Sequence, residues 1–451
     1  MTMWGGRPSE LAWSYTTDES DRRLLVFDLR GSLAHARMLG ATGSVSSEEA
    51  ERLVDGLSRL LEEAETGSFE FESADEDVHS AVERRLGELV GVSAGGLHTG
   101  RSRNDQVVLD LRLYLMASGA ERRSQLHRLA STIADMAETH SSTIVPSYTH
   151  LQQAQPTSLG HHLLAHAWAA LRSADRFRDA LTRISASPLG SGASSGSSFP
   201  LDRQAVAEDL GMSGIIPNSL DAVGARDFVA EYVFAAAQSM ADLSRLADEV
   251  VLWATSEFGW VTLSSDISTG SSALPQKRNP DVAELIRGRS ASVFGDMTAI
   301  LALQKGLPLA YNRDFQEDKR IVFNADDILA ASIEAMIEVL GGLTFHVPAP
   351  LPNTVALDLA EVLVARGVPF REAHHVVATL VERLREEGRD LGRADGDDLA
   401  GAHPRLDAAD VSSLDPAGSL SRRRSPGAGH EESVREQVAE VRRRSAGHSL
   451  D

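Results

Sequence analysis

Three polar clusters in this sequence contain residue types that support anion binding or acid–base chemistry. The first, residues 98–106, combines Ser102, Arg103 and Asn104 with a second arginine just before a predicted helix. Guanidinium groups, hydroxyls and an amide beside a helix N-terminus form a natural anion site. By composition alone, a helix cap flanked by solvated arginines explains the cluster equally well, and both interpretations stay open at this point.

The second cluster, residues 148–156, also precedes a predicted helix and contains Thr149 next to His150. An imidazole changes its charge near neutral pH, so a histidine beside a hydroxyl suits general acid–base catalysis. A lone histidine is more often a hydrogen-bonded structural residue, and the residue types by themselves favour that alternative.

The third cluster, residues 268–280, is a loop rich in Gly, Ser and Pro that contains Ser271, Lys277 and Asn279. It ends at Pro280, which predicts the start of a further helix. A serine is a poor base unless nearby positive charge stabilises its deprotonated form. Lys277 and the helix N-terminus would supply that charge, whereas the alternative is a mobile linker without chemistry.

Long amphipathic helices are predicted to position these clusters. One apolar stripe runs from Val108 to Met136 with alternating spacings of three and four, and similar patterns cover 158–184 and 228–253. Such spacing is typical of helices that bury one face in a bundle. Shorter helices are predicted at 47–67 and from 431, with a loop at 91–100. Because alternating strand patterns are missing, we expect an all-α fold with a central long-helix bundle.

The composition narrows the possible classes of function. The chain has 451 residues, of which 42% are hydrophobic, so a large core is possible. Its net charge of −21 disfavours nucleic acid as a partner. The lack of cysteine fits a reducing compartment. With no signal-like start and no long apolar run, the sequence predicts a cytoplasmic protein without membrane contact.

Lysine is almost absent from this acidic chain. Of 44 Lys and Arg residues, only Lys277, Lys305 and Lys319 are lysines. An acidic, arginine-rich surface is typical of adaptation to high salt, where screening weakens self-repulsion, so we predict a halophilic source. The remaining lysines then mark positions where arginine does not serve, although Lys305 has no assigned role.

Taken together, the clusters resemble the signature segments of the fumarase/aspartase superfamily and, within it, those of the argininosuccinate lyases. Gly270-Ser271-Ser272 and the following Pro275, Lys277, Asn279 and Pro280 resemble the superfamily signature loop. Residues 98–106 resemble the argininosuccinate lyase form of the first cluster. Further matching segments are 4–7, 75–79, 188–192, 226–231, 311–314, 316–319 and 369–374.

The resemblance implies a cofactor-free carbon–nitrogen lyase that splits argininosuccinate into arginine and fumarate by anti elimination, the last step of arginine biosynthesis. It makes Ser271 the base, while Lys277 and Asn279 stabilise the carbanion as an aci-carboxylate. It makes His150 the acid-side partner, paired with Glu284, a carboxylate that would favour the imidazolium form.

The same resemblance assigns the substrate contacts. Arg103 and Asn104 are expected to hold the carboxylates of the succinyl half. Thr17 stands where the family usually has a serine that contacts substrate. Threonine keeps the hydroxyl and adds a methyl group, so the same contact is expected of Thr17. The remaining expected contacts are Ser102, Thr149, Tyr311, Gln316, Lys319, Asp77 and His79.

Members of the resembled family are homotetramers whose long helices form a common core and whose active sites combine segments of three chains. This implies an N-terminal helical domain at 1–100, a central bundle domain at 101–349 and a C-terminal helical domain at 350–451. The alternatives are another fumarate-releasing lyase of the superfamily and a catalytically silent structural protein of the crystallin type.

No metal site is predicted. His162 and His166 form a pair at i, i+4, with His161 beside them, and such pairs occur in metal sites. No acidic third ligand follows at a useful spacing, however, and the resembled family uses no metal. The Gly/Ser-rich loop 190–198 lacks the lysine of a phosphate-binding loop.

Overall fold

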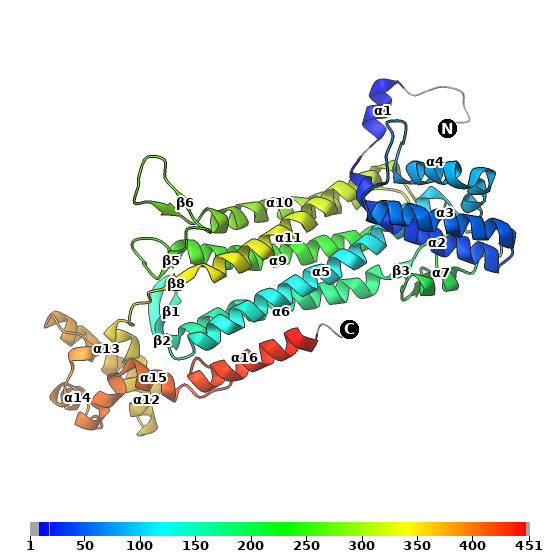
Figure 1. Ribbon diagram of the computed structural model, residues 1–451. Coiled ribbons are helices and arrows are strands. Elements are labelled where there is room, and N and C mark those ends of the chain that lie inside the picture. Colours follow the sequence, from blue (N-terminus) through cyan, green and yellow to red (C-terminus); the bar gives the residue numbers. More distant parts are fainter. Residues whose placement is uncertain (1–8, 18, 448–451) are drawn as a thin grey trace. The chain divides into compact units, whose positions relative to one another are not determined.

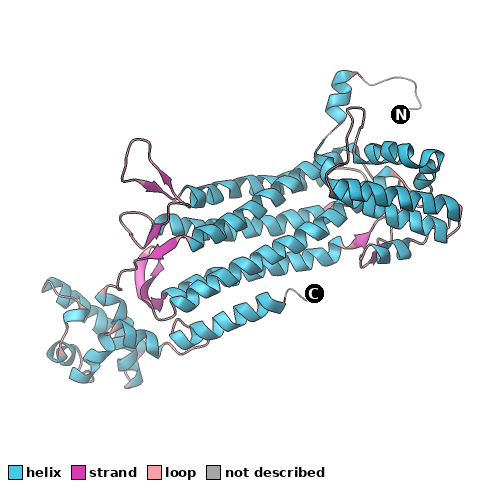
Figure 2. Ribbon diagram, viewed as in Figure 1, coloured by secondary structure: helices cyan, strands magenta, loops and turns pink. Residues whose placement is uncertain are grey.

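The computed structural model describes residues 9–17 and 19–447, so the matching segment 4–7 lies outside the described residues. Helices make up most of the described chain, and its strands are short (Figure 1, Figure 2). The prediction of an all-α fold is confirmed. None of the helices within the described ranges combines the length and the apolarity that a membrane crossing needs.

The chain divides into two compact units, each assembled from separate stretches of sequence. The first unit comprises Met1–Arg123, Asp175–Gln238 and Ser290–Ala330, and the second comprises Ser124–Ala174, Ser239–Arg289 and Ala331–Asp451. The division into domains at 100 and 350 stays a prediction.

Long helices contribute residues to both units. They are α5 (Arg103–Thr139), α6 (Leu159–Ile184), α9 (Asp227–Trp253), α10 (Asp281–Gln304) and α11 (Asp318–Gly341). The apolar stripe predicted along α5 is buried at Val108, Leu111 and Ile133, which explains why so long a segment is helical. The patterns at 158–184 and 228–253 are confirmed as α6 and α9, and the predicted start near 280 is that of α10.

In the first unit, α2 (Leu25–Ala41), α3 (Ser47–Glu65) and α4 (Val78–Val90) pack side by side (Figure 1). The Ser46 hydroxyl caps α3 by accepting the N–H of Glu49 at 3.2 Å, and Leu53, Leu57 and Leu60 form its buried face. The stretch predicted as a loop at 91–100 is largely the 3₁₀ helix η2 (Gly91–His98). The other elements are α1 (Glu10–Thr16), η1 (Glu19–Leu24), β3 (Ala186–Ser187), α7 (Arg203–Asp209), β4 (Gly214–Ile215), α8 (Ser219–Gly224) and η3 (Arg313–Glu317).

The second unit contains the hairpins and the C-terminal helices. Antiparallel pairs are β1 (Ile144–Thr149) with β2 (Gln152–Ser158), β5 (Val261–Leu263) with β8 (Leu343–Phe345), and β6 (Thr269–Gly270) with β7 (Arg278–Asn279). The C-terminal elements are η4 (Pro352–Val355), α12 (Ala356–Ala365), α13 (Phe370–Glu386), η5 (Leu391–Arg393), α14 (Gly396–Ala402), η6 (Ala408–Leu414), α15 (Pro416–Arg422) and α16 (Glu431–Ala446). Leu359, Leu363 and Leu380 belong to a separate core that α12, α13 and the following turns enclose.

Candidate active site

Most of the expected substrate-binding residues line one pocket of about 190 Å³ in the first unit. They come from three stretches that are far apart in the sequence: the start of α4, the start of α5 and the segment around η3. The expected residues on its wall are Asp77, His79, Arg103, Asn104, Tyr311, Gln316 and Lys319. The structure thus joins three segments that the sequence analysis treated separately.

The start of α4 fixes one acidic wall of this pocket. One oxygen of Asp77 accepts the backbone N–H of Ser80 at 2.7 Å, and the Ser80 hydroxyl accepts the N–H of Asp77, which completes a capping box. The other carboxylate oxygen of Asp77 lies 3.2 Å from Nη1 of Arg103. The same residue therefore starts the helix and orients a cation toward the pocket.

Arg103 is the central cation of the pocket and stands among carboxylates. Its Nη1 lies 3.6 Å from Glu76, its Nη2 lies 3.9 Å from Glu83, and 40% of its side chain is exposed. Ion pairs this long and this exposed contribute little to stability. Its guanidinium can therefore turn to a substrate carboxylate at small cost.

The segment around η3 supplies the opposite wall. Lys319 is only 6% exposed, and its Nζ lies 3.2 Å from the buried carboxylate of Asp318. The amide of Gln316 donates to the carbonyl oxygen of Thr16 at 3.1 Å. Thr16 lines the pocket, whereas the Thr17 hydroxyl donates to the carbonyl of Trp13 at 2.8 Å. The substrate contact expected of Thr17 stays a prediction that this arrangement does not favour.

His79 is a buried histidine on the pocket wall. Its Nδ1 lies 3.0 Å from Oδ1 of Asp28 and 3.6 Å from Asp110. Burial by itself lowers the pKa of His79, but the hydrogen bond and the charge of Asp28 outweigh it, so the pKa is raised. Burial and the charge of Asp28 raise the pKa of Asp110 well above its usual value. The hydrogen bond to Asp28 thus favours the imidazolium form of His79, and burial favours the neutral form of Asp110.

Asp21 is a pocket residue that the sequence analysis did not single out. Its carboxylate accepts the N–H of Val78 at 3.2 Å, at the first residue of α4. Burial raises the pKa of Asp21 to about 6, even though this hydrogen bond and the charge of His79 oppose the effect. The pocket therefore contains an acid that titrates close to neutral pH.

Asp105 was also missed, although it lies inside the first cluster. Its carboxylate accepts three backbone N–H groups, from Ser102 at 2.9 Å, Gly190 at 3.0 Å and Gly192 at 2.8 Å. Both glycines have positive φ values, 85° and 62°, which other residues rarely adopt. Asp105 thus ties the first cluster to the Gly/Ser-rich loop, and the side-chain amide of Asn104 donates to Ala193 in the same loop at 3.1 Å.

The expected contact Ser102 has a local role in the structure. Its hydroxyl accepts the backbone N–H of Asn104 at 3.2 Å, and it is not among the residues that line the pocket. Ser102 therefore shapes the start of α5, and its contact with substrate stays a prediction.

The other expected site residues belong to the second unit. Thr149 ends β1, and His150 with Leu151 forms the two-residue turn to β2. Both turn residues have positive φ values, 54° and 56°. This is the backbone of a type I′ turn, which normally selects Asn-Gly and costs energy for other side chains. The hairpin presents His150 at an exposed tip.

Ser271 follows a second hairpin strand, β6, in the loop that leads to β7. Its Oγ accepts the backbone N–H groups of Ala273 at 3.2 Å and Leu274 at 3.0 Å. Lys277, in the same loop, is exposed, and Asn279 pairs with Thr269 across the hairpin. Two N–H groups directed at one oxygen favour the alkoxide form of that serine.

Glu284, in the first turn of α10, is exposed, and its carboxylate lies 3.9 Å from Arg287. Within the described residues of the second unit, no hydrogen bond or ion pair joins Glu284 to His150. The pairing of this carboxylate with the histidine stays a prediction.

Comparisons with known proteins decide the family. The family described as "Lyase" matches residues 7–295, and the family described as "Argininosuccinate lyase C-terminal" matches residues 353–421. The argininosuccinate lyase of Roseiflexus sp. (strain RS-1) is 46% identical over 98% of this chain and 99% of its own length. The chain belongs to the argininosuccinate lyase family. The argininosuccinate lyase of Anaeromyxobacter dehalogenans (strain 2CP-C) is 47% identical over 94% of this chain and 91% of its own length.

Solved structures agree with this assignment. An EDDS lyase in complex with formate superposes with a TM-score of 0.83 at 27% identity and covers 99% of this chain and 92% of its own. A class II fumarase from Schistosoma mansoni has a TM-score of 0.75 at 15% identity, over 91% of this chain and 92% of its own, and shows the same fold. The resemblance to the fumarase/aspartase superfamily is thus confirmed.

Proposed function

We propose that this chain cleaves argininosuccinate into arginine and fumarate. The observation that carries this proposal is the mixed charge of the first-unit pocket, where Arg103 and Lys319 stand beside Asp21, Glu76 and Asp77. Argininosuccinate carries carboxylates at both ends together with an ammonium and a guanidinium group. A pocket with fixed charges of both signs suits such a molecule, and family membership supplies the reaction.

Ser271 is proposed as the base. As its alkoxide it removes a proton from the carbon next to a succinyl carboxylate, and the resulting electron pair forms the double bond of fumarate. The bond to the guanidinium nitrogen breaks, and that nitrogen leaves with its electron pair and takes up a proton on the acid side of the site, which gives arginine. The N–H groups of Ala273 and Leu274 support this role because they stabilise the alkoxide.

Lys277 and Asn279 are proposed to stabilise the aci-carboxylate, whose second negative charge is the main obstacle to this elimination. Both lie in the same hairpin as Ser271. One segment thus supplies the base and the groups that stabilise the negative charge formed when the base removes the proton. His150 and Glu284 are proposed as the acid-side pair, with Thr149 as a substrate contact beside them.

We further propose a homotetramer in which the segments of different chains complete each site. Helix α10 supports this, because it exposes Leu285, Phe294 and Leu301 with 57%, 43% and 52% of their surface. Large apolar side chains exposed along one helix are typical of a protein interface.

Subunit mixing tests this assembly. His150→Asn and Ser271→Ala chains, each inactive alone, are unfolded and refolded together. If each site takes these residues from different chains of a symmetric oligomer, about a quarter of the sites should carry neither lesion and regain activity. Tetramers of confirmed mass without any recovered activity would contradict shared sites.

A halophilic source and a cytoplasmic location remain further proposals. The net charge of −21 and the near absence of lysine support adaptation to salt. The Debye length falls to about 3 Å at 1 M salt, so surface repulsion should weaken and the thermal midpoint should rise in molar KCl. Full activity and stability without salt, and no gain with it, would contradict the proposal.

A fumarate absorbance assay tests the reaction. Purified protein in molar KCl is compared on argininosuccinate, adenylosuccinate, malate and aspartate. Fumarate from argininosuccinate alone, lost in Ser271→Ala, is the expected result. Fumarate from another substrate would move the assignment within the superfamily, and no product from a folded tetramer would favour a silent structural protein.

A further inference from the structure

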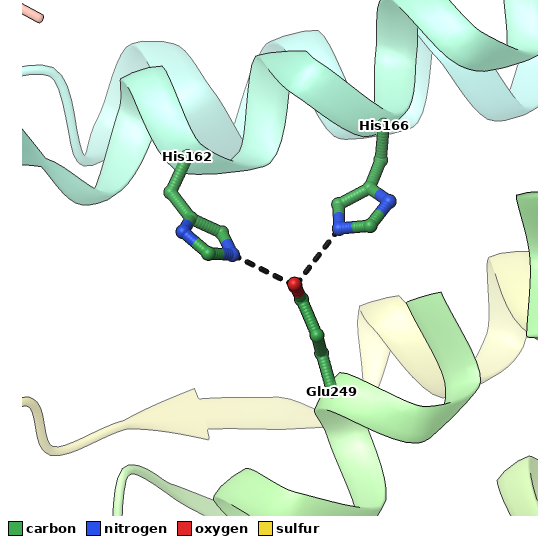
Figure 3. A group of neighbouring side chains, drawn as sticks. All are labelled: His162, His166 and Glu249. Carbon is green, nitrogen blue, oxygen red and sulfur yellow. Dashed lines mark hydrogen bonds and ion pairs between the residues drawn. The ribbon is translucent and has the colours of Figure 1, made fainter. Parts of the chain in front are cut away.

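Within the second unit, α6 and α9 bring together two histidines and a glutamate that have no part in the proposed elimination. His162 and His166 lie one turn apart on α6, and Glu249 faces them from α9 (Figure 3). The Nε2 atoms of the histidines lie 2.7 and 2.8 Å from the same carboxylate oxygen, Oε2 of Glu249. Their side chains are 25%, 13% and 32% exposed, so the group is sheltered yet accessible.

The group lies on the wall of a cavity of about 680 Å³ in the same unit. Its three potential ligand atoms all lie within 4.8 Å of one another. Tetrahedral zinc with bonds near 2.0–2.1 Å holds its ligand atoms about 3.3 Å apart. The two nitrogen–oxygen separations are about half an ångström shorter than this, so small side-chain rotations would bring these atoms to coordination distance.

The chemistry of the donor set also fits a metal. Two imidazole nitrogens and one carboxylate are a set of three protein ligands that leaves a fourth position of zinc open.

We propose that His162, His166 and Glu249 bind a divalent transition metal ion, with Zn²⁺ as the best match, and leave one coordination position open to the cavity. The sequence analysis expected no metal because no acidic residue follows the histidines at useful spacing. The third ligand instead comes from 83 residues beyond His166, on another helix.

The surroundings indicate what would fill the open position. Arg172 and Arg245 also line the cavity and are exposed. Cationic side chains near a bound metal favour an anionic fourth ligand, such as a carboxylate or hydroxide, over a neutral one. The site is thus expected to take a metal together with a small anion.

A second group with similar residue types, His79 with Asp28 and Asp110, does not carry the same inference. All three of its residues are buried, and His79 alone among them lines the pocket of the candidate active site. Of the two groups found among the described residues, the one on α6 and α9 has three partly exposed ligands on the wall of a cavity.

Calorimetric titration of the untagged full-length protein with ZnCl₂ in metal-free buffer tests the proposal. The wild type should bind one ion per chain. Each of three variants should weaken zinc binding at least about tenfold: His162→Asn, His166→Asn and Glu249→Gln. Loss of a residue that merely hydrogen-bonds to a metal ligand weakens binding about 10–100-fold, and loss of the ligand itself should have a larger effect. His161→Asn, a neighbour in the same cavity, is the matched control and should bind as the wild type does.

Co²⁺ and thermal unfolding give readouts that do not depend on activity. Four-coordinate Co²⁺ absorbs strongly in the visible range, and a chain without cysteine has no thiolate bands to obscure this signal. Zn²⁺ should raise the thermal midpoint of the wild type and the control but not of the three variants.

Circular dichroism verifies that each variant is folded, and fumarate production should be unchanged because none of the three ligands belongs to the proposed catalytic residues. Absence of binding by the wild type would overturn the proposal. So would binding of wild-type affinity by a folded variant that lacks both His162 and His166.

Discussion

The pocket of the first unit and the two loops of the second unit that contain Ser271 and His150 hold their side chains in different ways. In the pocket, Asp77 caps a helix, Lys319 contacts a buried carboxylate, and His79 is held by Asp28. In the second unit, the bonds of Ser271 to described residues all go to backbone groups of its own loop, and His150 occupies the exposed tip of a hairpin. Contacts within the first unit hold the pocket side chains in place. The reactive side chains of the two loops have fewer such contacts and can form further ones.

This difference predicts that substitutions in the two regions have different effects on stability and on catalysis. Asp77, Lys319 and His79 also support the fold around them, so their loss should change stability together with substrate binding. Side chains of the loops have few contacts to lose, and their loss should therefore affect the reaction alone. Substitutions in each region test this separation.

The largest effect is expected for Ser271→Ala. Removal of a general base typically lowers kcat by 10²–10⁴-fold, and we expect about 10³-fold here. The thermal midpoint should stay that of the wild type, because the Ser271 hydroxyl accepts only two N–H groups in an exposed turn. Steady-state kinetics and calorimetric scans measure both quantities.

Ser272→Ala is the matched control, since Ser272 is an exposed hydroxyl at the next position. It should keep kcat within a few-fold of the wild type. Equal losses in the two variants would indicate that the loop needs its conformation rather than one particular hydroxyl.

A smaller effect on catalysis is expected for Arg103→Lys. Lysine keeps the charge but cannot bind a carboxylate through two parallel N–H groups, so kcat/KM should fall by about 10²-fold, mainly through KM. Stability should change little, because lysine keeps the charge and the ion pairs of Arg103 are partly exposed. Arg52→Lys, at an exposed pair with Glu48 on α3, should leave kcat/KM unchanged. A fall in kcat alone would contradict a role in substrate binding.

The sequence was sufficient to predict the long helices and the types of residue in the candidate site. The stripe along α5 repeats over many turns, and burial of Val108 and Leu111 follows directly from that period. The three polar clusters were found because each gathers several polar residues within a few positions, whereas Asp77, Tyr311 and Lys319 came from the resemblance to the family. Their meeting in one pocket could not be derived from spacing, since residues 77, 103 and 319 are brought together only by packing.

What the sequence did not indicate depends on contacts between distant residues. Asp105 resembles any helix-start acid, and only the structure shows that it binds the N–H groups of Gly190 and Gly192. Glu249 lies on a different helix from the histidines that it faces. The hairpin of His150 was missed because His150-Leu151 lacks the Asn-Gly signal of such turns.

Stability as a function of pH sharpens the comparison within the pocket. Burial raises the folded-state pKa of Asp21 to about 6, so the folded chain binds its proton more tightly than the unfolded chain does. Ionisation of Asp21 therefore lowers the stability of the wild type as pH rises from about 4 to 6, and this contribution persists above that range. Asp21→Asn removes the buried charge and keeps an acceptor for the Val78 N–H.

We expect Asp21→Asn to match the wild type near pH 4 and to be more stable by about 1–2 kcal/mol at pH 8, below the roughly 3 kcal/mol that the full pKa change allows. Thermal midpoints of both proteins across this range measure the difference. Asp55→Asn, on the exposed side of α3, should give no gain that depends on pH. A constant gain at all pH values would show that the charge of Asp21 is not its cause.

The smallest effect is expected at the His150 hairpin. Leu151 is 72% exposed and has a φ of 56°, a conformation that costs a residue other than glycine about 1–2 kcal/mol. Leu151→Gly removes this cost but makes the unfolded chain more flexible, so the net gain in stability should be at most about 0.5 kcal/mol. The turn itself should persist, and kcat should stay close to that of the wild type.

Leu151→Ala is the control, because alanine keeps the unfavourable φ while it removes the same exposed side chain. If strain dominates, thermal midpoints should rank the glycine variant first and the alanine variant no higher than the wild type. Equal losses in both variants would mean that the Leu151 side chain is itself needed. Because that side chain has so little cover within its own chain, such losses would indicate that it packs against another subunit. The exposed hairpin would then be an interface element, and the strain at its tip would be balanced by assembly rather than by contacts within one chain.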